Sequence, residues 1–199
     1  MFFTMTRIAE ISRKTKETEV KLRLNIDGSG KSKIDTPIKF LNHMLENFSR
    51  HSRFDLELKA DGDTEVEDHH LVEDIGICLG MAIDNALGNK IGISRIGSAI
   101  VPMDDSLATV AVDLSGRGYA RIDIRFSEFK DSRIGDLKKE NVPHFLETLA
   151  INGRFNLHVR VEGENDHHRV EAIFKALGKA LYDATRIIGN ELPSTKGVL

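Results

Sequence analysis

Two copies of a short cluster rich in histidine mark this chain of 199 residues. The first is DHHLVED at residues 68–74, and the second is DHHRVEA at residues 166–172. Imidazole nitrogens and carboxylate oxygens are common ligands of divalent metals, so each copy could contribute to a metal site. Half of the eight histidines lie in these two clusters, which makes them the first candidates for chemistry.

On an α-helix, residues four positions apart share a face, whereas adjacent residues point about 100° apart. His69 and Glu73 can therefore hold one ion together, while His70 points elsewhere. The second copy repeats this division in His167, Glu171 and His168. If the two odd histidines are exchanged between the repeats, two related metal sites result.

Two upstream histidines, His43 and His144, precede the clusters at matched positions and are natural further ligands. A single His-x-x-x-Glu pair is more often a solvated surface pair, but a duplicated pair with these partners favours metal binding. The pattern differs from the His-Glu-x-x-His of metalloproteases, and the absence of cysteine ligands excludes a thiolate site. Ligand type alone does not choose among Mn, Fe, Zn and Ni.

The duplication extends well beyond the clusters. Residues 43–83 align with residues 144–181 if the second copy carries a three-residue deletion. Both copies contain His-x-Leu-Glu, Arg-Phe-x-Leu, Asp-His-His and a later glycine, which is Gly80 or Gly178. Such matched intervals predict two related halves.

Each half must place its cluster at the start of a helix. FDLELKAD and FNLHVRVE alternate apolar and polar residues, which predicts half-buried strands. The segments after the clusters repeat apolar residues as amphipathic helices do, with Asp68 and Asp166 as expected N-caps. PIKFLNHMLENFSRH and VPHFLETLAING predict shorter helices. RIAEISRK and TEVKLRLNIDG predict a hairpin, and AIVPMD, LATVAVDLSG and YARIDIRF predict strands.

We therefore predict an α+β fold in which two β-β-α-β-α halves each form a sheet with helices on one face. The expected first half is 7–92, the second half is 93–189, and 190–199 form a C-terminal phosphate-binding tail, all within one compact domain. The pattern leaves open whether the halves pack helix against helix or sheet against sheet.

The composition, 40% hydrophobic and 30% charged residues, is typical of a soluble globular protein. A net charge of −3 and a pI of about 6.2 give no reason to expect a nucleic-acid partner. Cys78 is the single cysteine, which excludes an internal disulfide and suggests a reducing compartment. With neither a secretory signal nor a membrane-spanning segment, we expect a cytoplasmic location and no membrane partner.

Five segments together resemble the imidazoleglycerol-phosphate dehydratase family of histidine biosynthesis: HMLENFSRH, DHHLVEDIGI, SRIGSAIVPMDDSL, NDHHRVEAIFKALGKAL and PSTKGVL. The likeness runs from about Arg7 to Leu199 and fits the stand-alone form. It implies a hydro-lyase that converts imidazoleglycerol phosphate, an imidazole bearing a dihydroxypropyl phosphate chain, to imidazole-acetol phosphate. It also implies two Mn²⁺ ions per active site, ligands from neighbouring subunits, and trimers that assemble into a 24-subunit shell.

The resemblance also implies roles for individual residues. One metal site would hold His43, His70, His167 and Glu171; the other would hold His69, Glu73, His144 and His168. The two ions would hold the substrate ring as an imidazolate, because metal-bound groups lose protons readily. Glu17 in RKTKET is the implied acid/base; by itself it would be one charge on a strand.

The implied phosphate-binding residues are Arg95, Arg117, Lys175, Ser194, Thr195 and Lys196. Each alone is more often a surface or turn residue, although the PSTKG tail could fold over an anion and order when it binds. His43, Asn47 and His51 are expected to line the substrate, while the residues alone leave His51 open and favour a structural role for His158. Asn42, Asn47 and Ile96 depart from the commonest family pattern.

Two other functions stay open. A dinuclear metal hydrolase of phosphoesters would use the ions to activate water, and Glu17 would be incidental. A metal-storage or structural module would saturate the ions with ligands and would need no acid/base.

Overall fold

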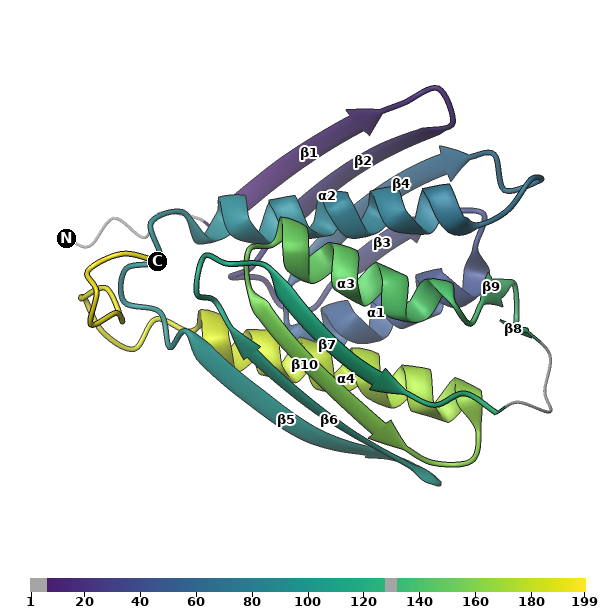
Figure 1. Ribbon diagram of the computed structural model, residues 1–199. Coiled ribbons are helices and arrows are strands. Elements are labelled where there is room, and N and C mark those ends of the chain that lie inside the picture. The colour runs from purple at the N-terminus through teal and green to yellow at the C-terminus, as the bar shows by residue number, and fades with distance from the viewer. Residues whose placement is uncertain (1–6, 128–131) are drawn as a thin grey trace.

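Two four-stranded sheets enclose a layer of four helices in this computed structural model, which describes residues 7–127 and 132–199 (Figure 1). Each sheet belongs to one half of the chain, and its inner face carries helices of the same half. The predicted α+β class and the placement of helices on one face of each sheet are confirmed.

The first half contains one strand more than expected. Its elements are β1 (Ile8–Lys14), β2 (Thr18–Asn25), β3 (Ser32–Asp35), α1 (Lys39–Ser52), β4 (Asp55–Gly62) and α2 (His69–Leu87). The hairpin of β1 and β2 agrees with the prediction, and the sheet order is β1-β2-β4-β3 with β3 parallel to β4. Sequence patterning missed β3 because its four residues contain a single large apolar side chain.

The second half repeats this β-β-β-α-β-α order around a small extra hairpin. Its elements are β5 (Ile96–Met103), β6 (Ser106–Asp113), β7 (Tyr119–Ile124), β8 (Arg133–Ile134), β9 (Leu137–Lys138), α3 (Asn141–Asn152), β10 (Asn156–Glu162) and α4 (Asp166–Thr185). The sheet order β5-β6-β10-β7, with β7 parallel to β10, matches the first sheet strand for strand. The duplication seen in the sequence is therefore a duplication of topology.

The halves pack helix against helix, with α2 on α3 and α1 on α4 (Figure 1). The matched glycines make this possible. A Cβ atom on Gly80 would lie 2.6 Å from the carbonyl oxygen of Leu149, and one on Gly178 would lie 2.8 Å from that of Phe48. Both positions thus allow two helix backbones to approach closely.

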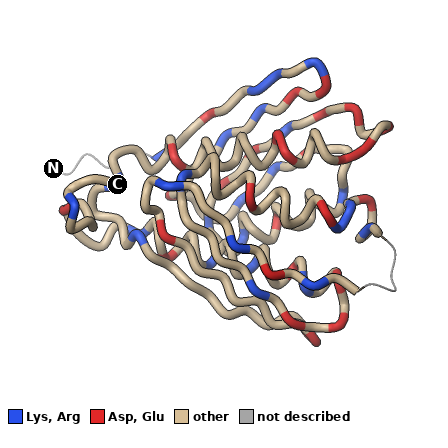
Figure 2. The backbone as a smooth tube through the Cα atoms, viewed as in Figure 1, with Lys and Arg blue, Asp and Glu red and all other residues tan. Residues whose placement is uncertain are grey.

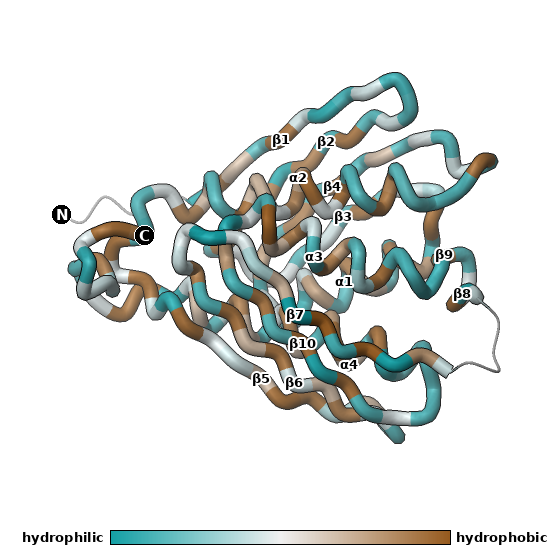
Figure 3. Tube along the Cα trace, in the orientation of Figure 1, coloured by the Kyte–Doolittle hydropathy of each residue, from teal (hydrophilic) through white to brown (hydrophobic). Residues whose placement is uncertain are grey.

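Alternating patterns along the strands divide the inner layer from the outer faces. Val110 on β6 and Val159 on β10 form a buried cross-strand pair, and Figure 3 shows the alternation of hydrophobic and hydrophilic residues along these strands. The outer face of the first sheet is charged, with Arg23 3.3 Å from Glu10 and 3.4 Å from Glu57. Charges of both signs are interspersed along the strands (Figure 2).

All four helices begin at the end of the molecule opposite the C-terminus (Figure 1). Asp68 is the N-cap residue of α2, but its side chain accepts the backbone N–H of Lys138 at 2.7 Å instead of capping the helix. The prediction that Asp166 caps α4 is wrong, because Asn165 does so and accepts the N–H groups of His167 and His168.

Asp166 is instead the first residue of α4, and its carboxylate pairs with Lys139 at 2.8 Å. The two aspartates therefore bind the adjacent residues Lys138 and Lys139, which precede α3, and hold them beside the starts of α2 and α4.

Among the described residues, no helix combines the length and the apolar character that crossing a bilayer requires.

Candidate metal centre and substrate site

The common start of the four helices gathers six histidines at one end of the molecule. They come from α1 (His43), from α3 (His144), and as adjacent pairs from α2 and α4 (His69, His70, His167 and His168). Strands β4 and β10 lead into the paired clusters, so the sheets fix the positions of both helix starts.

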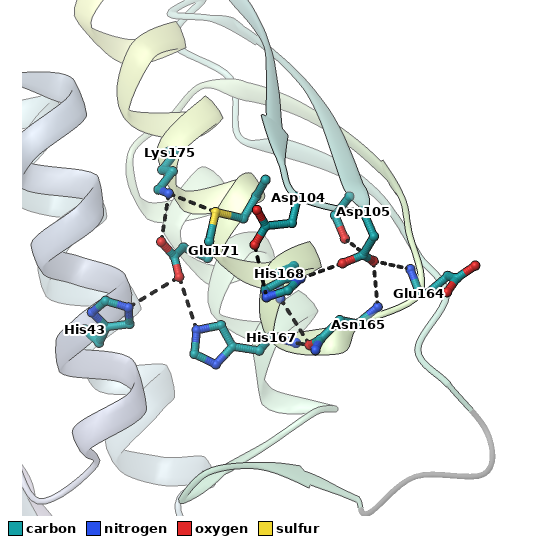
Figure 4. A network of polar contacts seen from close by, with 11 residues as sticks. His43, Asp104, Asp105, Glu164, Asn165, His167, His168, Glu171 and Lys175 are labelled. Carbon is teal, nitrogen blue, oxygen red and sulfur yellow. Dashed lines mark hydrogen bonds and ion pairs between the residues drawn. The ribbon is translucent and has the colours of Figure 1, made fainter.

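One group of candidate ligands, the α1/α4 cluster, consists of His43, His167 and Glu171. Nε2 of His43 lies 3.4 Å from Oε2 of Glu171, and Nε2 of His167 lies 3.1 Å from the same oxygen (Figure 4). Burial raises the pKa of Glu171, but Lys175 at 2.8 Å and His167 outweigh burial and leave the pKa below its usual value. The carboxylate is therefore ionised and available as a ligand.

A second group, the α2/α3 cluster, consists of His69, Glu73 and His144. The rings of His69 and His144 stack with centroids 4.5 Å apart, and Nε2 of His144 lies 3.4 Å from Oε1 of Glu73. Nδ1 of His69 lies 3.2 Å from the side-chain oxygen of Asn141, an orienting partner that sequence reasoning missed. The Nε2 atom of His144 is buried without a hydrogen bond, which is the state of a nitrogen that a cation would satisfy.

In each group, one candidate atom from each of the three residues lies within 4.8 Å of the others. Each group also contains three of the four ligands expected for one metal ion. The predicted fourth ligands lie elsewhere in the chain. His70 lies 3.5 Å from Glu17 and 3.6 Å from Asp63, and His168 contacts Asp104 and Asp105. Within the described residues of one chain, the exchange of the odd histidines does not take place.

Glu17 lies in the bend between β1 and β2, and not on a strand as the sequence pattern suggested. Its side chain is 54% exposed. The backbone N–H groups of Glu17 and Thr18 both donate to Oγ1 of Thr15, and the hydroxyl of Thr18 donates to the buried carboxylate of Asp74. The bend is thus fixed to α2, beside His70.

The predicted phosphate-binding residues fall into two groups at opposite ends of the molecule. Lys175 belongs to the helix-start end, through its contact with Glu171. Arg95 lies at the other end, since its backbone N–H donates to Ala184 near the end of α4. Along α4, Ala184 is about 25 Å from His167 at ~1.5 Å per residue.

The C-terminal tail lies beside Arg95, whose guanidinium donates to the carbonyl oxygen of Pro193 at 2.8 Å and pairs with Asp113 at 2.7 Å. Ser194 donates to the carbonyl oxygen of Val198 at 2.8 Å. The other predicted residues of this end are Arg117, in the loop between β6 and β7, and Thr195 and Lys196, in the tail. This end of the molecule carries three of the four predicted phosphate-binding cations, all but Lys175, and none of the six clustered histidines.

Two predicted substrate-lining residues follow His43 on α1. The side-chain nitrogen of Asn47 donates to the carbonyl oxygen of His43 at 3.1 Å and lies 3.5 Å from its Nε2 atom. His51 lies one turn further, where burial and the nearby charges of Lys175 and Lys179 lower its pKa. Both lie on the helix that carries the candidate ligand His43.

The comparisons with known proteins all find members of the same family. A family model described as imidazoleglycerol-phosphate dehydratase matches residues 36–181. The imidazoleglycerol-phosphate dehydratase of Methanothermobacter thermautotrophicus is 54% identical, over 94% of this chain and 95% of that protein. That of Desulforudis audaxviator is 53% identical, over 98% of this chain and 99% of that protein.

Two solved structures share the fold. The Staphylococcus aureus imidazoleglycerol-phosphate dehydratase is 36% identical with a TM-score of 0.81, covering 90% of this chain and 99% of that one. The Pyrococcus furiosus enzyme, in complex with (S)-C348, is 37% identical with a TM-score of 0.81, covering 95% and 100%.

Proposed function

Because the chain belongs to the imidazoleglycerol-phosphate dehydratase family, hydro-lyases of histidine biosynthesis, we propose that it dehydrates imidazoleglycerol phosphate at a site that holds two Mn²⁺ ions. The observation that carries this proposal is the pair of three-ligand clusters at the helix starts. One cluster has His43, His167 and Glu171, and the other has His69, Glu73 and His144.

The donors present suit such ions. Each cluster offers two imidazole nitrogens and one carboxylate, a set compatible with Mn²⁺ and with open coordination positions. The Nε2 atom of His144, which is buried without a hydrogen bond, supports the fit. His70 and His168 would complete the two sites as ligands from neighbouring copies of the chain.

The difficult step is removal of a proton from a weakly acidic carbon. When bound, the two ions would make the ring N–H of the substrate more acidic, so that the ring can supply electrons toward the departing hydroxyl. Glu17 is the acid/base group, because its exposed carboxylate stands beside His70 on a bend anchored to α2. Asn47 and the clustered histidines orient the dihydroxypropyl phosphate group of the substrate, which carries the hydroxyls.

The separation of the two ends argues for an assembly. A substrate of one ring and a three-carbon phosphate chain reaches about 10 Å at ~1.5 Å per bond. It cannot extend from His167 to Ala184, about 25 Å away along α4, where the backbone N–H of Arg95 donates to the Ala184 carbonyl oxygen of the same chain. The phosphate-binding residues Arg95, Arg117, Ser194, Thr195 and Lys196 would therefore serve the metal clusters of a neighbouring copy. Closed trimers and a 24-subunit shell are the assembly we propose, within the cytoplasm.

The test is a dehydration assay on imidazoleglycerol phosphate, with enzyme stripped by a chelator and then reloaded with Mn²⁺. Formation of an enolisable ketone only after reloading is the expected result. Release of inorganic phosphate would instead indicate a phosphoester hydrolase, and tight Mn²⁺ binding without turnover would indicate a storage or structural site. Either outcome would contradict the proposal.

A further inference from the structure

The turn between β5 and β6 brings two aspartates against the second histidine of α4. Oδ1 of Asp105 lies 2.5 Å from Nδ1 of His168, and Asp104 lies 3.5 Å from the Nε2 atom on the other side of the ring (Figure 4). A carboxylate only accepts hydrogen bonds when ionised, so this contact requires the proton to be on Nδ1 of His168.

Asp105 is held in place by more than the histidine. Its other oxygen, Oδ2, accepts the backbone N–H of Glu164 at 2.6 Å and that of Asn165 at 2.8 Å (Figure 4). The contact with His168 and the bonds from these two amides fix the Asp105 carboxylate in place. The aspartate is therefore a fixed acceptor that ties the hairpin to the start of α4.

The internal duplication gives Asp105 a counterpart, Glu17. Gly62 and Gly163 each lie eight residues after the matched Phe54 and Phe155. Thr18, the first residue of β2, pairs with Gly62. Ser106, the first residue of β6, lies against Gly163, as Thr18 lies against Gly62.

Glu17 precedes Thr18 directly, as Asp105 precedes Ser106. The histidines that they face, His70 and His168, are the second members of the two His-His pairs. The contacts nevertheless differ. Glu17 is 54% exposed and lies 3.5 Å from Nδ1 of His70, whereas the Asp105 side chain is 30% exposed and bonded on both oxygens.

We propose that Asp105 is a positioning residue for the metal centre, which holds the proton of His168 on Nδ1 and so presents the lone pair of Nε2 to the ion. This inference rests on the proposed function, since His168 would complete the α2/α3 cluster of a neighbouring copy. A carboxylate behind a metal-bound histidine fixes both the tautomer and the ring orientation. The same hairpin position thus supplies an acid/base group in one half and a ligand-orienting group in the other.

Asp105→Asn tests the idea, because the amide oxygen can still accept the N–H groups of Glu164 and Asn165. Its NH₂ group would then face Nδ1 of His168 and donate to it, which favours the tautomer with the proton on Nε2. A protonated Nε2 has no free lone pair and cannot bind a metal. We expect one of the two Mn²⁺ ions per chain to bind about 10- to 100-fold more weakly in equilibrium dialysis. The melting temperature of the metal-free protein should be little changed.

Asp55→Asn is the matched control. Oδ1 of Asp55 accepts the backbone N–H groups of Ser29 at 2.8 Å and Lys31 at 2.9 Å. Among the residues that the structure describes, no histidine forms a hydrogen bond or an ion pair with Asp55. This variant should bind both Mn²⁺ ions as the wild type does. Asp105→Glu, which keeps a charged acceptor, should bind the weakened ion more tightly than Asp105→Asn.

The outcomes separate the two proposals. Equal weakening in Asp105→Asn and Asp105→Glu would assign Asp105 to support of the loop alone and overturn the inference. Unchanged Mn²⁺ affinity in Asp105→Asn would also overturn it while leaving the proposed function intact. A wild-type protein that binds no Mn²⁺ would overturn the proposed function itself, and the inference with it.

Discussion

At the scale of single residues, the His-His-x-x-Glu pattern divides its members between two environments. In the second copy, His167 shares a face of α4 with Glu171 and lies 3.1 Å from it, while His168 turns toward the hairpin of β5 and β6. Helix geometry alone explains this division, because adjacent side chains diverge by about 100°. The pair of histidines thus offers one candidate ligand to the local cluster and a second that faces away from it.

The two glutamates of the pattern are expected to retain metal. Glu73→Gln and Glu171→Gln each replace a charged ligand by a neutral amide, so Mn²⁺ affinity should fall by at least about tenfold, as losses of even outer partners do. Metal content after dialysis is the measurement. Glu147→Gln, an exposed change on α3, is the control. Full Mn²⁺ retention in both cluster variants would remove these residues from the ligand set.

Glu17 is expected to act on protons and not on metal. Glu17→Gln should keep Mn²⁺ content and assembly but lower kcat about 10²- to 10⁴-fold, the usual contribution of a general acid/base. Glu19→Gln, on the same hairpin but paired with Lys14 and Lys21, should leave kcat near the wild-type value. A fully active Glu17→Gln enzyme would exclude the residue from the reaction.

At the scale of elements, two hairpin turns and two helix pairs determine the site. The turn that carries Glu17 is fastened through Thr15 and Thr18 to Asp74 of α2, whereas the turn that carries Asp105 is fastened to the start of α4. The second copy has Ala172 where the first has Asp74, so each half holds its turn by different contacts. The positions of Glu17 and Asp105 therefore depend on where α2 and α4 lie, as the positions of the candidate metal ligands do.

Close helix packing should be sensitive to a single methyl group. Gly80→Ala and Gly178→Ala would place a Cβ atom 2.6 Å and 2.8 Å from backbone oxygens of the facing helix. Overpacking of this kind costs about 1–3 kcal/mol, which exceeds the gain of up to about 1 kcal/mol in helix propensity. Thermal unfolding should show lower melting temperatures, with Gly189→Ala, which has open space, as the control. A rise in melting temperature would show that the helices can separate at no cost.

At the scale of the whole molecule, Arg95 lies at the opposite end of α4 from the two candidate metal clusters. The proposed site needs both ends, so two chains would have to build it. Two defective variants should therefore restore each other in mixed assemblies. Glu73→Gln removes a proposed ligand from the α2/α3 cluster. The double change Arg95→Gln with Lys196→Gln removes two proposed phosphate-binding cations from the C-terminal end, here called the phosphate end.

Each variant alone should be nearly inactive. After joint refolding, about a quarter of the sites should combine an intact cluster with an intact phosphate end if two chains build each site. Dehydration activity of the mixed preparation is the measurement, and each variant refolded alone is the control. Activity that never exceeds that of the separate variants would mean that one chain builds the whole site.

Local periodicity and repeated spacing determined much of this protein from the sequence: the duplicated halves, the strands before each cluster, the helices after it and the His69–Glu73 and His167–Glu171 pairings. These features depend on neighbours within a few residues, which a pattern records. Only the tertiary structure decided that helix packs on helix through Gly80 and Gly178, that His70 and His168 leave the local clusters, and that Arg95 lies a helix length from His167. The carboxylates behind the odd histidines also come from distant hairpins. Such contacts join residues far apart in the chain, and the packing of whole elements, not local preference, sets their distances.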